Sequence, residues 1–347
     1  MRYSSRLGGS NEAITMGNSI KRTLAGRDVA AIGLGCMSLS HGYGRAPDTA
    51  YATQLLNRAL DLGYDHLDTA RIYGMGRNEA LVGEALKGRR HEFFLASKCG
   101  IVIEGEARRI DCRPATIDAA LETSLKLLQT DHIDLYYMHR RDRSVPIEES
   151  VGAMARHVEA GRIGAIGLSE MSAETLRKAA AVHPIAALQN EFSPWTRNPE
   201  LGVLAACAEL GTTLVAFSPL GRGALAGGVP DPAALTEHDM RRGMPRFQGE
   251  NWLANTVLIA GFAEIAAQAG VTAAQLALGW VLAQGGHVVA IPGTASVPHL
   301  EENFGRADWL PDAGVCARVD ALINQVTVAG RRYSAAMQAS IDTEEYV

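Results

Sequence analysis

Several segments of this 347-residue chain repeat one order of features: a helical stretch, a glycine, a short apolar strand and a polar loop. The helical stretch ends at Gly63, Gly161 and Gly211, and glycine suits the left-handed residue that closes a helix. The strand that follows is apolar almost throughout, which is typical of parallel strands covered by helices. The repeat therefore restricts the chain to an α/β fold with a parallel sheet.

Eight such strands can be counted, with no change in composition that would divide the chain into domains. Eight strand–helix units favour a single (β/α)8 TIM barrel, with a doubly wound open sheet as the alternative because periodicity does not show closure. The expected strands lie near 28–34, 65–69, 92–97, 133–138, 163–168, 186–190, 213–217 and 288–291. The expected helices lie near 49–62, 77–87, 114–129, 147–160, 172–182, 198–210 and 254–284, the last broken at Gly270.

Three stretches stand apart from the repeated units. Residues 1–22 are polar and lack the apolar core of a signal peptide, so we expect a disordered extension ahead of a barrel over 23–330. Residues 221–252 form a long loop after the seventh strand, which we interpret as a flap over a cofactor, with a plain insertion as the alternative. Residues 331–347 form a C-terminal tail, and its position over the pocket mouth stays open.

The composition excludes several classes of partner. A formal net charge of −5 gives no electrostatic footprint for nucleic acid or for an anionic membrane. No apolar run approaches the length of a membrane helix, which is about 18 residues. The five cysteines are scattered without metal-ligand spacing, which is typical of reduced thiols in a cytoplasmic protein. We expect a cytoplasmic, metal-free protein, monomeric or homo-oligomeric, that acts on a small molecule.

Four polar residues, Asp68, Tyr73, Lys98 and His139, follow or end the second, third and fourth expected strands. The carboxyl ends of barrel strands are where working side chains gather. Tyr73 is a natural proton donor, Lys98 would acidify its phenol, and Asp68 would pair with the buried ammonium. His139 could hydrogen-bond and orient a substrate oxygen. A positioned general acid of this kind contributes roughly 10²–10⁴-fold in rate.

Other interpretations of these residues stay open from the pattern alone. Taken singly, a lysine after a strand is most often solvated, and a lone histidine is more often structural. Lys98 could also form a Schiff base in an isomerase or aldolase barrel, although Asp68 and Tyr73 would then have no role.

Longer motifs resemble the aldo-keto reductase superfamily from about residue 24 onward. HLDTARIYG (66–74), DLYYMHRRD (134–142) and IPGTASVPHLEEN (291–303) are similar to its catalytic and cofactor signatures. GLGCMSLSHGYG (33–44) and RFQGENW (246–252) look most like the perakine-reductase and auxin-induced-protein branch. The resemblance implies that Asp68, Tyr73, Lys98 and His139 form the catalytic tetrad, with Tyr73 as acid. It also implies reversible NADPH-dependent reduction of an aldehyde or ketone.

The resemblance further implies a set of cofactor contacts. Ser169 and Gln189 match residues that hold the nicotinamide carboxamide, and Phe217 matches a ring that stacks on the nicotinamide. Positions that commonly carry Lys or Arg for the adenosine 2′-phosphate hold Gly293, Ala295 and His299 here, so NADPH is expected with NADH as the alternative. His299 or Arg222 would partly compensate. The remaining expected contacts are Ser218, Pro219, Leu220, Gly221, Arg222 and Gly223 near the pyrophosphate, and Thr294, Ser296, Glu302 and Asn303 near the adenosine.

The substrate pocket is expected to include Tyr43, Arg140, Met171 and Trp195. These residue types are compatible with many carbonyl compounds, so they do not identify one. The rival to an enzyme is a nicotinamide-binding redox-sensing subunit with slow turnover, which similar barrels provide for potassium channels. Such a subunit would oxidise its cofactor once rather than repeatedly.

Overall fold

The computed structural model describes residues 19–105, 107–227 and 231–346. Its central feature is one sheet of eight parallel strands in the order β3-β4-β5-β8-β9-β10-β11-β12. The first and last strands meet through parallel bridges that pair Ile32 with Ala290 and Gly35 with Gly293. A Cβ on Gly35 would lie 2.9 Å from the Ile291 carbonyl oxygen, so the close approach of these strands requires glycine. The sheet is therefore a closed (β/α)8 barrel, as predicted, and the open sheet is excluded.

The strands of the barrel agree with the expected ones in seven of eight places. They are β3 (Leu34–Gly35), β4 (His66–Asp68), β5 (Phe94–Cys99), β8 (Ile133–Met138), β9 (Ile163–Ser169), β10 (Ile185–Glu191), β11 (Thr213–Phe217) and β12 (Val288–Ile291).

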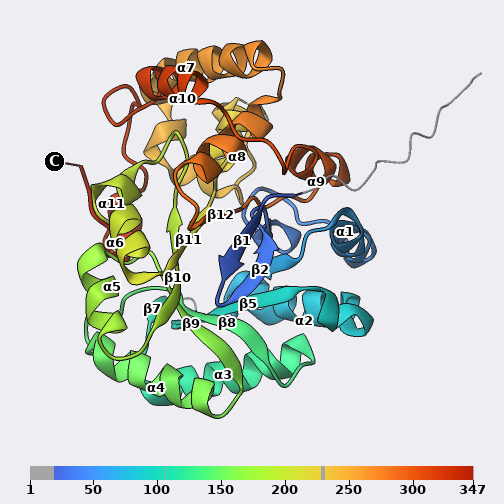
Figure 1. The fold of residues 1–347 in the computed structure, drawn as a ribbon, viewed down its shortest axis with the longest axis vertical. Helices are drawn as coiled ribbons and strands as arrows, with labels where there is room; N and C mark the ends of the chain where they lie inside the picture. Colours follow the sequence, from blue (N-terminus) through green and yellow to red (C-terminus); the bar gives the residue numbers. More distant parts are fainter. Residues whose placement is uncertain (1–18, 106, 228–230, 347) are drawn as a thin grey trace, which may run out of the picture.

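Helices surround the barrel, as Figure 1 shows. Their starts and ends follow local capping signals: Asp48 caps the first helix, and Gly63 closes it with a φ of 100°. Pro114 occupies the first turn of the third helix. The helices are α1 (Thr49–Leu62), α2 (Arg77–Ala85), α3 (Pro114–Leu128), α4 (Ile147–Glu159), α5 (Ala173–Ala180), α6 (Val203–Leu210), α7 (Gly249–Gln268), α8 (Ala273–Ala283), α9 (Val297–Phe304), α10 (Ala313–Leu322) and α11 (Ala335–Gln338).

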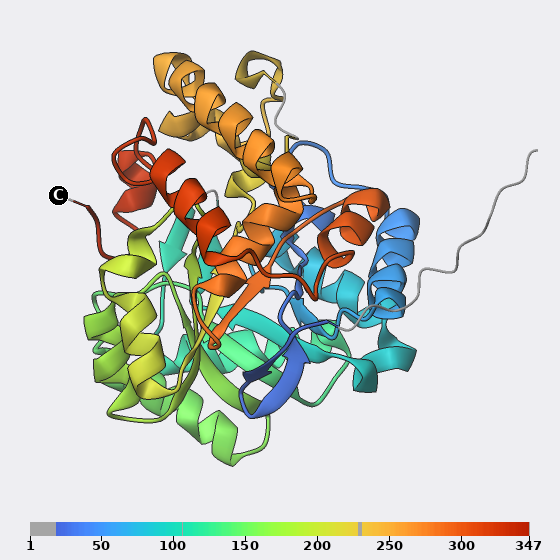
Figure 2. The same cartoon turned by 45° about the horizontal axis from the view of Figure 1, so that its top comes forward.

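The expected first strand, 28–34, is wrong as a single element. The chain instead forms a hairpin of β1 (Lys21–Leu24) and β2 (Arg27–Ala30), and it enters the barrel only at β3. Ala25 and Gly26 both have positive φ and make the tight turn. The hairpin covers the amino-terminal end of the barrel (Figures 1 and 2), where Leu24 and Val29 pack into the barrel interior. Strand β1 also shortens the expected extension of 1–22, of which residues 1–18 lie outside the described residues.

The carboxyl-terminal end of the barrel carries the additional structure. Strands β6 (Ile101–Glu104) and β7 (Ala107–Ile110) form a hairpin after β5, and the described residues of the 221–252 loop form short 3-10 turns before α7 begins at Gly249. Sequence periodicity missed this hairpin and the helices α9, α10 and α11 because each is short. Their caps were present, however: Ser296, Asp312 and Ser334 each accept a hydrogen bond from a backbone N–H of the first turn.

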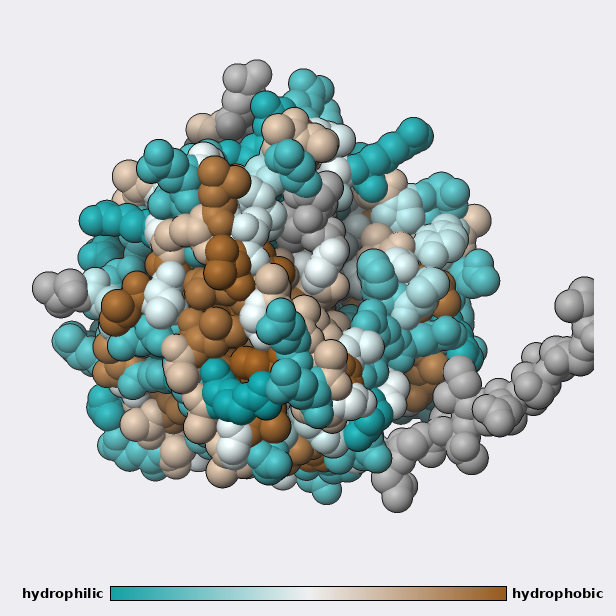
Figure 3. All heavy atoms as spheres, turned by 90° about the horizontal axis from the view of Figure 1, so that it is seen from above, coloured by the Kyte–Doolittle hydropathy of each residue, from teal (hydrophilic) through white to brown (hydrophobic). Residues whose placement is uncertain are grey.

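Helix α7 lies against α10 at the edge of the molecule and leaves an apolar face in solvent. Leu253 is 66 % exposed and Val257 is 70 % exposed, and Figure 3 shows hydrophobic residues gathered on this side. In the part of the chain that the structure describes, no single helix meets the length and hydropathy needed to cross a membrane. One bent pair, α7 with α8, meets them jointly by length and composition.

Candidate active site

A buried ion pair lies where β4 and β5 end. The Lys98 ammonium donates to Asp68 Oδ1, and it also donates to the Thr69 carbonyl oxygen at 2.9 Å. Gln189, on β10, donates from Nε2 to the other carboxylate oxygen of Asp68 at 2.8 Å. Burial alone would lower the pKa of Lys98, but the negative charge of Asp68 and the Tyr73 phenol outweigh it and raise the pKa. Lys98 is therefore charged and fixed in position.

Tyr73 and His139 stand beside this ion pair. The Lys98 ammonium lies 5.3 Å from the centroid of the Tyr73 ring. The ring centroids of Tyr73 and His139 are 5.9 Å apart and the rings meet edge to face. The structure thus brings together the four residues that the sequence singled out, from the ends of three neighbouring strands.

The protonation states of the two rings follow from burial. Burial raises the pKa of Tyr73, and Lys98 lowers it only part of the way back, so the phenol is protonated at neutral pH. Lys98 lowers the pKa of the phenol, as expected, but loss of water outweighs this effect and the net shift is upward. Burial, together with the positive charges of Arg140, Lys98 and Arg108, holds the pKa of His139 well below its usual range. The imidazole is therefore neutral.

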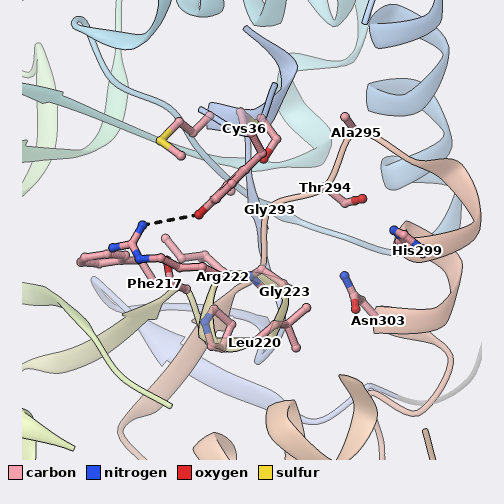
Figure 4. A pocket seen from close by; sticks show the side chains of 18 of the residues that line it. Cys36, Phe217, Leu220, Arg222, Gly223, Gly293, Thr294, Ala295, His299 and Asn303 are labelled. Carbon is pink, nitrogen blue, oxygen red and sulfur yellow. Dashed lines mark hydrogen bonds between the residues drawn. The ribbon is translucent and has the colours of Figure 1, made fainter. Parts of the chain in front are cut away.

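A cavity of about 420 Å³ extends from Asp68 and Tyr73 across the carboxyl end of the barrel to α9. Figure 4 shows His299 and Asn303 of α9 facing the segment 220–223 across it. Most of the expected cofactor residues line this cavity: Gln189, Phe217, Ser218, Pro219, Leu220, Arg222, Gly223, Gly293, Thr294, Ser296, His299, Glu302 and Asn303. Ser169 is buried at the end of β9 and Gly221 lies within the loop, and neither lines the cavity.

The loop that contains Gly221, Arg222 and Gly223 follows β11 in an uncommon backbone conformation. Ser218, Gly221, Arg222 and Gly223 all have positive φ, between 50° and 93°. Within this turn the Gly221 N–H donates to the Ser218 carbonyl oxygen and the Gly223 N–H donates to the Leu220 carbonyl oxygen, each at 3.0 Å. The tight turn brings the backbone of Leu220 and Gly223 to the wall of the cavity.

Arg222 does not offer its charge to the adenosine end of the cavity. Its guanidinium donates to Glu191 Oε2 at 2.5 Å and to the Tyr333 hydroxyl at 3.0 Å, and all three side chains are buried. The expectation that Arg222 compensates for a missing phosphate ligand therefore does not hold. The other residue named for that role, His299, lines the cavity from α9 (Figure 4).

The four expected substrate residues separate into two groups. Tyr43 lines the cavity, where its hydroxyl accepts from Arg222 Nη1 at 3.4 Å. Arg140 follows His139 directly after β8 and lies beside the catalytic residues, but it does not line the cavity. Met171 is fully buried in the core, and Trp195 is stacked on Phe247 with ring centroids 6.0 Å apart. Neither lines the cavity, because the C-terminal tail covers this side of the barrel and bridges Met171 through Asp342.

Sequence reasoning missed two residues beside the catalytic pair. The His41 ring lies 5.4 Å from that of Tyr73, and Arg108 on β7 lies close enough to contribute to the pKa of His139. His41 was visible within the motif SLSHGYG, whereas Arg108 depends on a hairpin that periodicity did not reveal. Among the described residues, no group of three or more His, Cys, Asp or Glu side chains is arranged to hold a metal ion.

Comparison with known proteins decides the family. The family model described as the aldo/keto reductase family matches residues 31–324. The chain belongs to the aldo/keto reductase family. This confirms the resemblance seen in the motifs, and it makes the protein an oxidoreductase; the narrower branch stays a prediction.

Individual relatives of this aldo-keto reductase agree over most of its length. An NADP(+) aldo-keto reductase of Schizosaccharomyces pombe is 42 % identical over 320 residues, covering 90 % of this chain and 94 % of the relative. Among solved structures, a glycerol dehydrogenase from Gluconobacter oxydans has a TM-score of 0.81 at 26 % identity, covering 91 % and 98 % of the two chains. An aldo-keto reductase from Klebsiella pneumoniae in complex with NADP has a TM-score of 0.69 at 27 % identity, covering 91 % and 99 %.

Proposed function

We propose that this aldo-keto reductase uses NADPH to reduce an aldehyde or ketone to the alcohol, and that it catalyses the reverse oxidation at the same site. The observation that carries the proposal is the buried Lys98–Asp68 ion pair, which holds an ammonium beside the phenol of Tyr73. Its relatives are named as NADP(+)-dependent enzymes or were solved with that cofactor. The five cysteines are free thiols, which suits the reducing cytoplasm.

The cavity fits a nicotinamide dinucleotide. One end is bounded by Asp68 and Tyr73 and flanked by the Phe217 ring, which suits a flat nicotinamide. The tight turn at Leu220 and Gly223, which lines the middle of the cavity, suits the pyrophosphate. The amino-terminal end of α9 suits the adenosine phosphate, because backbone N–H groups there favour anions. NADPH supplies the hydride for the carbonyl carbon when it is bound.

The protein residues then control the carbonyl oxygen. Tyr73, protonated because its pKa is raised, donates its proton to that oxygen. Lys98 stabilises the phenolate that remains, and Asp68, itself held by Gln189, keeps Lys98 in place. Neutral His139 donates a hydrogen bond to the substrate oxygen and fixes its orientation. Each group has one role, and none of these roles requires a metal ligand set.

The test is repeated oxidation of NADPH, followed by absorbance, with a panel of aldehydes and ketones. The proposal requires many turnovers per protein molecule with at least one carbonyl. A single stoichiometric oxidation would instead favour the redox-sensing subunit. NADH measured in parallel establishes which cofactor the protein prefers.

A further inference from the structure

We propose that Thr69 and Asn78 are positioning residues that together aim the Lys98 ammonium at the Tyr73 hydroxyl. The inference rests on the proposed carbonyl reduction and adds two residues to the machinery of that site. Neither residue lines the cavity, so both act through the groups that they hold. A continuous chain of hydrogen bonds, which runs from the start of helix α2 to the ammonium, carries the inference.

The direction of the Lys98 ammonium depends on two acceptors. An ammonium group has three N–H donors, so two fixed hydrogen bonds determine where the third N–H points. One N–H donates to Asp68 Oδ1, and another donates to the Thr69 carbonyl oxygen at 2.9 Å. The third is left for Tyr73, whose ring centroid lies 5.3 Å from the ammonium nitrogen. The Thr69 carbonyl therefore aims this donor as much as the Asp68 carboxylate does.

Thr69 is held from two sides at the end of strand β4. Its N–H still pairs with the sheet, since it donates to the Ala96 carbonyl oxygen at 2.9 Å. Its hydroxyl donates to Asn78 Oδ1 at 2.6 Å, and the residue is only 1 % exposed. A β-branched side chain has few rotamers, so this buried hydrogen bond fixes the residue from which the carbonyl projects toward Lys98.

Asn78 lies in the first turn of α2 and is fully buried. Its amide nitrogen donates to the Cys36 carbonyl oxygen at 2.8 Å and to the Ser40 hydroxyl at 3.0 Å, while its oxygen accepts from Thr69. Both N–H groups and the acceptor are thus used, which gives the amide one orientation. Asn78 therefore ties the end of β4 to the loop that follows β3.

The turn between Tyr73 and Asn78 is strained. Gly74, Met75 and Gly76 follow one another with φ of 55°, 57° and 91°. A left-handed conformation is unfavourable for a methionine, so it persists only where the surrounding contacts impose it. The turn returns the Asn78 amide to the strand end that holds the ammonium, and strain of this kind is typical of functional sites.

The Asn78 amide also supports one wall of the cavity. Ser40, which accepts from Asn78, lies 3.1 Å through its Oγ from His41 Nδ1. His41 lines the cavity, and its ring centroid is 5.4 Å from that of Tyr73. Loss of Asn78 would therefore disturb both the ammonium and this wall. A change at Thr69 tests the ammonium alone, because the loop keeps its hydrogen bonds to Asn78.

The alternative role for two buried polar residues at a strand–helix junction is stability alone. That role predicts a lower unfolding free energy with an unchanged reaction rate and pH profile. The positioning role predicts a slower reaction and a shifted pH profile, because Lys98 lowers the pKa of the Tyr73 phenol only when its charge is held beside it.

The test is Thr69→Val, which replaces the hydroxyl by a methyl group of similar size and leaves the backbone carbonyl in place. We expect the single-turnover rate of carbonyl reduction to fall by about fivefold or more, the factor that one hydrogen bond corresponds to. The pH above which the rate falls should move upward, though less than in Lys98→Met, because a poorly aimed ammonium lowers the pKa of the phenol less. NADPH binding, followed by fluorescence, should stay at the wild-type level.

Two variants control for the loss of a buried hydroxyl. Thr69→Ser restores the hydroxyl and should recover most of the lost rate. Thr212→Val is the matched control, since Thr212 is also 1 % exposed and its hydroxyl donates to the Ile185 carbonyl oxygen at 2.8 Å. This control should lower the unfolding free energy, measured in urea, without changing the rate or the pH profile.

Asn78→Ala breaks the same hydrogen bond from the other partner. Because both changes act through one bond, adding Thr69→Val to Asn78→Ala should slow the reaction no further. If Thr69→Val does not fold, Asn78→Ala decides the question by the same rate and pH criteria.

A folded Thr69→Val protein with the wild-type rate and pH profile overturns the inference and leaves carbonyl reduction intact. An equal loss of rate in Thr212→Val also overturns it, because the loss would then reflect stability. Absence of turnover with every carbonyl in the wild type rejects the proposed function and the inference together.

Discussion

Glu170 and Arg332 form a buried bidentate ion pair that joins the end of β9 to the C-terminal tail. The guanidinium nitrogens lie 2.8 and 3.2 Å from the two carboxylate oxygens, and both side chains are almost fully excluded from solvent. The Asp342 N–H also donates to the Glu170 carbonyl oxygen at 2.9 Å. This pairing gives a physical reason for a buried glutamate at the end of β9.

Loss of this pair should destabilise the protein strongly. Glu170→Gln leaves the Arg332 charge buried without its partner, which costs about 3–5 kcal/mol of unfolding free energy. The control is Arg177→Ala, which breaks the exposed ion pair with Glu209 and should lower the unfolding free energy far less. Urea denaturation measures the unfolding free energy of both variants. If Glu170→Gln lowers the unfolding free energy no more than Arg177→Ala does, the packing of the tail does not depend on this ion pair.

Stability should also fall when the pH drops below about 6.5, the ordinary pKa of histidine. Burial lowers the pKa of His66 and holds that of His139 well below its usual range. In acid, the unfolded chain therefore binds protons that the folded chain does not. The contribution of each buried neutral histidine to the unfolding free energy is complete above about pH 6.5. As the pH falls from there toward the pKa that the histidine has in the folded protein, this contribution is lost at up to about 1.4 kcal/mol per pH unit for each histidine.

His66 offers the cleaner test of this pH dependence, because it lies in the core and its two ring nitrogens have no hydrogen-bond partner among the described residues. His66→Leu should make the fall in unfolding free energy between pH 7 and pH 5.5 less steep. His91→Gln, at an exposed position, should leave it unchanged. Urea denaturation at several pH values measures the unfolding free energy of both variants. If its slope against pH in His66→Leu equals that of the wild type, His66 is not a source of the pH dependence.

The sequence predicted those parts of the fold that depend on long periodic segments. Helix α1 begins and ends where Asp48 and Gly63 indicate, and the four catalytic candidates meet because parallel strands place their carboxyl ends together. The expected first strand was wrong because the run 28–34 divides after Ala30: its first part pairs with β1 in the hairpin, and the chain enters the barrel as β3 only at Leu34.

Features that depend on distant contacts could not be predicted from the sequence. The tail that carries Arg332 packs beside Glu170, although 162 positions separate them along the chain. Arg222 looked available for a phosphate because nothing local indicates its pairing with Glu191. Likewise, the position of Arg108 depends on a short hairpin with little periodic signal.

Cofactor preference should respond to a charge placed at the adenosine end of the cavity. Ala295 lines the cavity at a position where the family commonly has a basic residue. Ala295→Arg should strengthen NADPH binding by about 1.5–3 kcal/mol through charged hydrogen bonds to the 2′-phosphate, with little change for NADH. Fluorescence titration of both cofactors measures this. Equal strengthening of both would place residue 295 away from that phosphate.

The pH profile of reduction should reflect the raised pKa of Tyr73. Because the donor must be protonated, kcat should be constant through neutral pH and fall only above the ordinary tyrosine value of about 10. Lys98→Met should slow the reaction and move this fall to still higher pH, since Lys98 lowers the pKa of the phenol. A fall in kcat near neutrality in the wild type would contradict this assignment of the proton donor.

Turnover of Tyr73→Phe is the most direct test of the catalytic assignment. The variant keeps the ring beside Lys98 and His139 but removes the hydroxyl. We expect kcat for carbonyl reduction to fall by roughly 10²–10⁴-fold, while NADPH binding, followed by fluorescence, stays at the wild-type level. Reduction at an undiminished rate by Tyr73→Phe would contradict the account, because the proton would then come from another group.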